Sequence, residues 1–119
     1  MMQEKRRFVP KLDFLTSPGY LDGSPQAREK AGLPAQTGPY RVVTPLALFD
    51  FDEQTHRMHL IAIMPTVKVE EVLAEMGFEP LIAGTVEEMS PPTADELMWL
   101  RERIDPDRLV IGKGKTIRF

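Results

Sequence analysis

The sequence predicts an α/β fold in which a small mixed sheet is flanked by helices. Two runs, 42–51 and 58–64, carry apolar residues on both of their faces, as strands that are covered on both sides do. A helical stripe over 69–76 and a short apolar run at 81–83 follow them. Because strand and helix patterns alternate along the chain, they indicate layers of both kinds around one core.

Length and charge limit the classes of function. A chain of 119 residues is expected to form a single domain over 1–119, with flexible ends at 1–10 and 107–119. Lys+Arg 15 against Asp+Glu 18 gives a net charge of −3, which argues against a general nucleic-acid binder because such a protein needs a basic face. There is no cysteine, and no apolar run approaches the roughly 20 residues of a membrane span. We therefore expect a cytoplasmic protein without a nucleic-acid or membrane partner.

The first expected element is a short strand over Lys11–Thr16, in which Leu12 and Phe14 alternate with polar or opposite-facing residues. Turn residues at Ser17–Tyr20 end it. The loop 21–39 that follows is rich in Gly, Pro and Ser and holds one brief helical possibility at 26–31. A loop of this length usually carries function, disorder or a partner contact.

A hairpin of two buried strands comes next. The strands are Val42–Phe51 and Met58–Met64, and the polar connector Asp52–His56 has hairpin length. Pro45 has no N–H to donate to a ladder, so the first strand is expected to have a free side or a bulge there.

A helix is expected after the hairpin, because Val69, Val72, Leu73 and Met76 fall on one helical face. The pair Gly77-Phe78 is typical of a helix C-cap in which glycine takes the left-handed turn. A short strand over Leu81–Ala83 follows.

The last expected helix opens on the capping box that Thr93 and Glu96 form. Leu97, Leu100 and Ile104 would be its buried stripe, and Asp105-Pro106 would end it. Two helices barely supply two layers for strands that are apolar on both faces. The pattern therefore indicates that something outside the chain completes the fold.

Possible metal and phosphate sites have simpler interpretations. His56 and His59 would point to different sides of their segment and lack a third ligand, and the nearby acidic residues lack the spacing of a calcium loop. We therefore expect a solvated hairpin and no metal. The sequence Gly112–Lys115 is not a P-loop, and a flexible basic tail is favoured over a phosphate site.

The best ligand candidate is the turn at Ser17, Gly19 and Tyr20. It follows an expected strand, and ligands of α/β sheets gather where strands end. A purely structural turn is the simpler interpretation, and both stay open.

Three ordered blocks resemble the β subunit of class I CoA-transferases, in the glutaconate CoA-transferase branch. They are Arg6–Leu21, then Val42–Phe78 with Phe-Asp-Phe-Asp at 49–52, then Pro91–Leu97 leading to an Ile-Asp-Pro at 104–106. Two departures stand out. Thr66 replaces the glycine that follows the helix-entry proline in the family, and Lys68 replaces its capping threonine, so Thr66 would be the alternative cap.

The resemblance implies a truncated CoA-transferase-like α/β fold that corresponds to the C-terminal half of a β subunit. Such enzymes move CoA from an acyl thioester to a carboxylate through a glutamyl-CoA intermediate. Their nucleophilic glutamate precedes a glycine by two positions, and a glycine-rich loop holds the oxyanion. Here only Glu75-Met76-Gly77 has that spacing, at an expected helix end, and there is no glycine doublet. The resemblance thus implies no catalytic residue in this chain and no activity of the chain alone.

The partners implied are an N-terminal β part together with a CoA-transferase α subunit, or a second copy in a homo-oligomer. No cofactor is implied, and a CoA thioester would be the substrate of the assembly, with Ser17, Gly19 and Tyr20 lining its acyl or CoA cleft. The alternative function is a non-catalytic binding or assembly module derived from this fold, which dimerises through its two-sided strands. A third, an acyl-CoA-binding protein, rests only on the turn and the basic tail.

Overall fold

The computed structural model describes residues 2–112, which fall into two compact units. The larger unit extends to Met89 and the smaller begins at Ser90. Whether they behave as the one domain expected over 1–119 stays a prediction. No helix in the part of the chain that the structure describes combines the length and apolar character that crossing a membrane requires.

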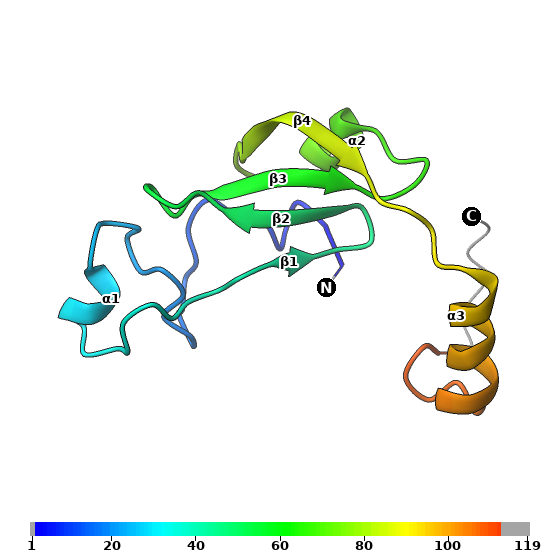
Figure 1. The fold of residues 1–119 in the computed structure, drawn as a ribbon. Helices are drawn as coiled ribbons and strands as arrows, with labels where there is room; N and C mark the ends of the chain where they lie inside the picture. The colour runs from blue at the N-terminus through cyan, green and yellow to red at the C-terminus, as the bar shows by residue number, and fades with distance from the viewer. Residues whose placement is uncertain (1, 113–119) are drawn as a thin grey trace. The chain divides into compact units, whose positions relative to one another are not determined.

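The larger unit is built on a mixed four-stranded sheet in the order β1-β2-β3-β4 (Figure 1). Strand β1 (Val42–Val43) pairs antiparallel with β2 (Ala47–Phe51), and β2 pairs antiparallel with β3 (Met58–Ile63). Strand β4 (Leu81–Glu88) runs parallel to β3, and the chain passes between them through the helix α2. The predicted α/β class with a mixed sheet is confirmed.

The expected strand 42–51 is two strands separated by a turn. The Thr44 hydroxyl accepts hydrogen bonds from the backbone N–H groups of Leu46 (3.1 Å) and Ala47 (2.9 Å), which bends the chain around Pro45. The single long strand was therefore wrong, because proline supplies a turn here and not only a gap in the ladder. The second strand and the polar connector of the hairpin are confirmed.

Helix α2 (Val69–Ala74) lays its apolar face on the sheet. Val72 and Met76 are buried in one cluster with Ala47, Phe49 and Leu60, as the apolar spacing predicted. Thr66 does not cap this helix. It has φ 68° in a turn closed by the bond from Val67 N–H to the Met64 carbonyl (3.1 Å), and Lys68 is the N-cap.

Gly77 serves close packing and not a left-handed turn, so the predicted C-cap geometry was wrong. Its φ is not positive, and its N–H donates to the Phe8 carbonyl at 2.6 Å. A Cβ at this position would lie 2.5 Å from that same carbonyl oxygen. The glycine is needed because the N-terminal segment crosses directly over it.

The N-terminal residues, which we expected to be a flexible end, carry two buried side chains. Phe8 is 3% exposed and packs in the core cluster with Phe49 and Phe78. The Gln3 amide donates to the Val72 carbonyl (2.9 Å) and accepts from the Thr44 hydroxyl (2.8 Å). These contacts fasten residues 3–8 across the sheet and α2.

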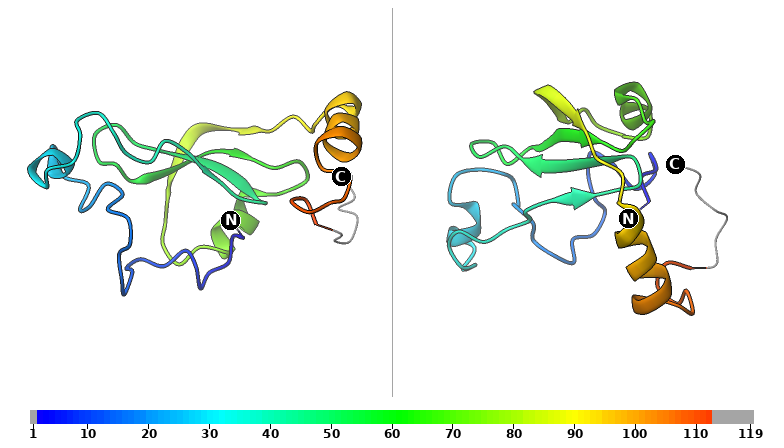
Figure 2. Two further views of the ribbon diagram at one scale, coloured as in Figure 1. Left: turned by 90° about the horizontal axis from the view of Figure 1, so that it is seen from below. Right: turned by 45° about the vertical axis from the view of Figure 1, so that its right-hand side comes forward.

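The strand expected at Lys11–Thr16 is absent from the structure, which has irregular backbone there. In the loop 21–39 the brief helix is confirmed as α1 (Ala27–Lys30). Two further views show that this loop lies beside the turn between β2 and β3 (Figure 2).

The smaller unit contains α3 (Ala94–Met98), which continues into the π-helical turn η1 (Trp99–Ile104). The predicted capping box is confirmed: the Thr93 hydroxyl accepts from Glu96 N–H at 3.2 Å, and the Glu96 carboxylate accepts from Thr93 N–H at 2.8 Å. The buried stripe was wrong, since Leu97 and Leu100 are half-buried and Ile104 is 73% exposed.

The helix of the smaller unit ends at Asp105, as expected. The Asp105 carboxylate accepts backbone hydrogen bonds from Leu109, Val110 and Ile111, and these bonds hold its pKa below the ordinary value for aspartate. Most of the tail Gly112–Lys115 lies outside the described residues.

Candidate functional site

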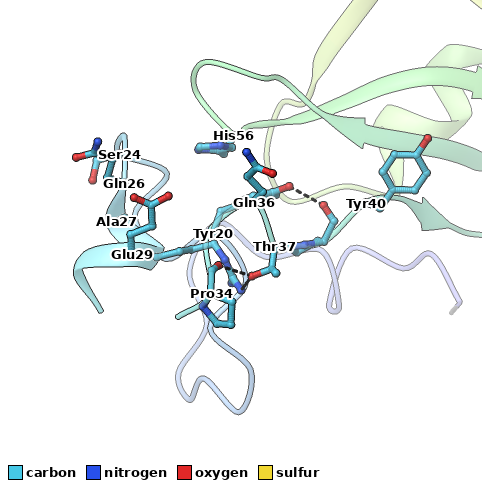
Figure 3. A pocket seen from close by; sticks show the side chains of 13 residues that line it. Tyr20, Ser24, Gln26, Ala27, Glu29, Pro34, Gln36, Thr37, Tyr40 and His56 are labelled. Atoms are coloured by element: carbon cyan, nitrogen blue, oxygen red, sulfur yellow. Dashed lines mark hydrogen bonds between the residues drawn. The ribbon is translucent and has the colours of Figure 1, made fainter. Parts of the chain in front are cut away.

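A hollow of about 680 Å³ lies between the long loop and the tip of the β2–β3 hairpin (Figure 3). Tyr20 and residues of the segment 24–40 line most of it, and His56 from the hairpin closes one side. The loop takes this position because Tyr20, at its beginning, contacts both His56 of the hairpin and Pro39 at the end of the loop.

Tyr20 is the anchor of the loop. Its ring stacks on His56 at 4.3 Å between centroids with 13° between the planes, and its edge meets Phe51 at 5.1 Å. Its hydroxyl donates to the Pro39 carbonyl at 2.7 Å. A Cβ at Gly38 would lie 2.6 Å from the ring, so the returning part of the loop presses directly on Tyr20.

His56 is held in place by the hairpin turn. The Asp52 carboxylate accepts from the Thr55 hydroxyl (2.6 Å) and from the backbone N–H of Thr55 (2.7 Å), and these bonds lower the pKa of Asp52. His56 takes φ 53° at the end of this turn, and its Nδ1 lies 3.0 Å from the Gly23 carbonyl. Because a carbonyl only accepts, this bond requires the proton on Nδ1 and leaves Nε2 as an acceptor in the neutral ring.

Arg28 of α1 crosses the base of the loop. Its guanidinium donates to the Gly19 carbonyl and to the Thr37 hydroxyl (2.8 Å), and Thr37 in turn donates to the Pro34 carbonyl (2.7 Å). Its Nε is buried without a hydrogen-bond partner among the described residues. The hollow thus has a cation, an imidazole acceptor and two tyrosines on its walls.

The three sequence-predicted residues have different positions. Tyr20 lines the hollow, and Gly19 takes part through its carbonyl, which accepts from Arg28. Ser17 is exposed and does not line it. Arg28 and His56 were missed as members of this site. The helical possibility at 26–31 and the hairpin connector were visible in the sequence, but only the fold brings them together.

A second polar group lies on the sheet. Asp50 of β2 and His59 of β3 are opposite each other, with 2.8 Å between the carboxylate and Nδ1, and Arg41 lies 3.3 Å from the other carboxylate oxygen. His56 and His59 thus have separate partners. Among residues 2–112 no three His, Asp or Glu side chains gather as metal ligands would.

Comparisons with known proteins show what the chain is similar to. No family model matches it. It is 45% identical over 111 residues to the B subunit of glutaconate CoA-transferase from Acidaminococcus fermentans, a match that includes 93% of this chain and 41% of that protein. The chain is a homologue of CoA-transferase B subunits. It corresponds to their C-terminal part and spans about two fifths of the length of these curated relatives.

Two other relatives of this B-subunit homologue have different names. It is 33% identical to the B subunit of 3-oxoadipate CoA-transferase from Pseudomonas knackmussii, over 85% of this chain and 38% of the relative. It is 34% identical to the cholesterol ring-cleaving hydrolase IpdB subunit of Mycobacterium tuberculosis, over 88% of this chain and 40% of the relative.

Solved structures confirm the fold of the B-subunit homologue. The crystal structure of glutaconate coenzyme A-transferase from Acidaminococcus fermentans superposes with a TM-score of 0.87 at 43% identity, over 96% of this chain and 43% of that one. IpdAB of Rhodococcus jostii superposes with a TM-score of 0.68 at 28% identity, over 90% of this chain and 42% of that one. The fold is therefore of the CoA-transferase-like α/β type.

Proposed function

We propose that this chain forms the C-terminal part of the scaffold of a CoA-transferase B subunit. In this proposal, CoA moves between an acyl-CoA and a carboxylic acid only in an assembly that also holds the N-terminal part of a B subunit and the partner α (A) subunit. The observation that carries the proposal is the 45% identity along 93% of the chain to only 41% of the glutaconate enzyme's B subunit.

The positions of the glutamates support a scaffold without its own nucleophile. Glu75, the one glutamate two positions before a glycine, is the C-cap of α2 and is exposed. Its neighbours Met76 and Gly77 serve the core and the crossing with Phe8. Packing therefore accounts for this Glu-x-Gly without catalysis, and in the proposal the reacting glutamate comes from outside this chain.

The names of the relatives also support a scaffold role for this chain, with the reacting glutamate supplied from outside it. Relatives that share this region are named as transferases of two substrates and as a ring-cleaving hydrolase. A region common to proteins with different reactions is expected to supply structure and binding surface more than the reacting group.

The hollow beside Tyr20 is the part of this chain that we assign to the acyl or CoA cleft of the assembly. Tyr20 lines it, Gly19 takes part through the carbonyl that accepts from Arg28, and Ser17 belongs to the same turn. Arg28 supplies positive charge, which suits an acceptor carboxylate or the phosphates of CoA because charge-assisted hydrogen bonds to such groups are strong.

The test is reconstitution of CoA transfer. The chain is assayed for transfer between acetyl-CoA and glutaconate, first alone and then co-expressed with two further polypeptides. These are the A subunit of the Acidaminococcus fermentans enzyme and the part of its B subunit that this chain does not match. We expect turnover only with all three polypeptides, and none when this chain is left out. Turnover at an enzymatic rate by the chain alone would show that it holds its own nucleophile.

The alternative, a non-catalytic assembly module that dimerises, is favoured by one observation. Leu12, Phe14 and Leu15 are more than half exposed. Light scattering after gel filtration separates the two functions, since a well-folded monomer leaves the dimeric module without support.

A further inference from the structure

Residues 11–17 form a strap that is fixed at both ends and free between them. On one side Phe8 is buried against Phe49 and Phe78, and its carbonyl accepts from Gly77 N–H at 2.6 Å. On the other side Tyr20 is stacked on His56. The path of the strap is therefore set by its anchors and not by contacts of its own.

The apolar side chains of the strap are exposed. Leu12 is 55% exposed, Phe14 79% and Leu15 53%. A single exposed apolar residue is ordinary on a protein surface, whereas three within four consecutive residues form a patch. Lys11 and Asp13 are the only charged residues of the strap, and low charge is typical of the centre of a protein interface.

The backbone of the strap is also without partners. No backbone N–H or C=O group of residues 11–17 forms a hydrogen bond with another described residue. Yet the alternation around Leu12 and Phe14 is that of a strand, which needs a neighbour in order to form its ladder. Both the side chains and the main chain of the strap therefore lack the partners that their pattern calls for.

The comparison structure indicates where such partners come from. The superposition on glutaconate coenzyme A-transferase includes 96% of this chain, so it leaves out too few residues to omit the whole strap. That crystal chain is more than twice as long as the matched region, since the match is 43% of it. The strap thus has a counterpart in the crystal chain of glutaconate coenzyme A-transferase. In that chain, the matched region and the larger unmatched part belong to one polypeptide.

We propose that the strap, residues 11–17, is the docking surface for the N-terminal part of a CoA-transferase B subunit. This inference rests on the proposed function and names the surface through which the assembly forms. The occupant offers an apolar surface for Phe14 and its neighbours and main-chain groups for the strap backbone. A part of the same folded unit fits best, because a permanent interface resembles a core cut in two.

The test compares an apolar-to-serine substitution in the strap with one outside it. Tagged wild-type chain, Phe14→Ser and the control Leu109→Ser, whose side chain is 83% exposed outside the strap, are each co-expressed with the non-matching part of the Acidaminococcus fermentans B subunit, without the A subunit. We expect wild type and L109S to retain that part equally and F14S to retain at least about tenfold less, as the loss of a buried aromatic anchor at an interface does. Since Phe14 is exposed, F14S should keep the circular dichroism and melting temperature of wild type, which excludes simple unfolding.

Hydrogen exchange gives the second measurement. Amides of residues 12–15 should exchange rapidly in the chain alone and become protected when the B-subunit part is bound. Equal retention by F14S and L109S, or no protection of the strap, would overturn the docking surface. So would a dimer of the chain alone that F14S dissociates, since the occupant would then be a second copy.

The outcomes also separate this inference from the function on which it rests. If the strap-dependent complex forms but adding the A subunit yields no CoA transfer, the proposed function fails and the docking surface stands. If the wild-type chain retains no B-subunit part at all, both proposals are wrong.

Discussion

Thr66 is the position where this chain departs most clearly from what its backbone requires. With φ 68° it is the third residue of a turn whose first carbonyl, that of Met64, accepts from Val67 N–H at 3.1 Å. Pro65 precedes it, and a Pro followed by a positive φ is the arrangement of a type II turn, in which glycine is preferred. Replacing Thr66 with glycine should therefore stabilise the larger unit.

The magnitude follows from two opposing terms. A left-handed conformation costs a residue other than glycine about 1–2 kcal/mol, and β-branched threonine is among the least suited to it. Glycine loses about 0.5–1 kcal/mol more conformational entropy on folding. Thr66 is exposed, so little packing is lost. The net gain in free energy of unfolding should be about 0.5–1 kcal/mol, or a rise of about 3–6 °C in melting temperature for a unit of this size.

The assay is urea and thermal unfolding of wild type, Thr66→Gly and a control, Thr85→Gly. Thr85 is also exposed, but it lies within β4 and its φ is not positive, so glycine there should destabilise by about 0.5–1 kcal/mol. Opposite signs for the two substitutions would support the reasoning. A loss of stability in both would refute it, because the turn would then not require a left-handed residue.

Three further substitutions follow from the packing and the site. Gly77→Ala should cost about 1–3 kcal/mol in a urea melt, because the new Cβ would meet the Phe8 carbonyl oxygen 2.5 Å away; a neutral effect would mean that the N-terminal segment is not seated there. Tyr20→Phe should cost about 0.5–1.5 kcal/mol by removing the bond to the Pro39 carbonyl, and should speed amide exchange in the loop 21–39 while β2 and β3 stay protected. Uniform exchange across the loop and the strands in that variant would contradict the anchoring role. The Asp105 carboxyl has a lowered pKa, so its contribution to the smaller unit is present above its unfolded pKa of about 3.9 and is lost as pH falls through the folded value. Carbon NMR should show that the pKa of the Asp105 carboxyl lies below the unfolded value. Asp105→Asn should remove the loss of stability of the smaller unit at low pH. A measured pKa of Asp105 above the unfolded value would be inconsistent with the three hydrogen bonds that its carboxylate accepts.

Local patterns predicted the hairpin, α2 and the capping box at Thr93, because each depends on residues close together in the sequence. Strand β4 was predicted only over its first residues. Its later part contains Gly84 and ends in Glu87 and Glu88, which look like a loop until β3 is known to pair with them.

The errors have a common physical origin in contacts between distant segments. Gly77 looked like a helix cap because its neighbours fit that pattern, whereas the Phe8 carbonyl, far away in sequence, determines it. The strap had the alternation of a strand, but alternation does not supply a pairing partner. At the candidate site Tyr20 was predicted from its place in a turn, and Arg28 and His56 were not, because only the folded loop brings them to Tyr20.

The central claim is that this chain supplies scaffold and binding surface to a CoA-transferase and not the reacting glutamate. The most direct measurement is the rate of CoA transfer in three samples: the chain alone, the chain with the A subunit plus the non-matching B-subunit part, and the same mixture with Glu75→Gln in this chain. We predict no transfer in the first sample and equal transfer in the other two. Transfer by the chain alone, or loss of transfer in the mixture that carries Glu75→Gln, would contradict the account.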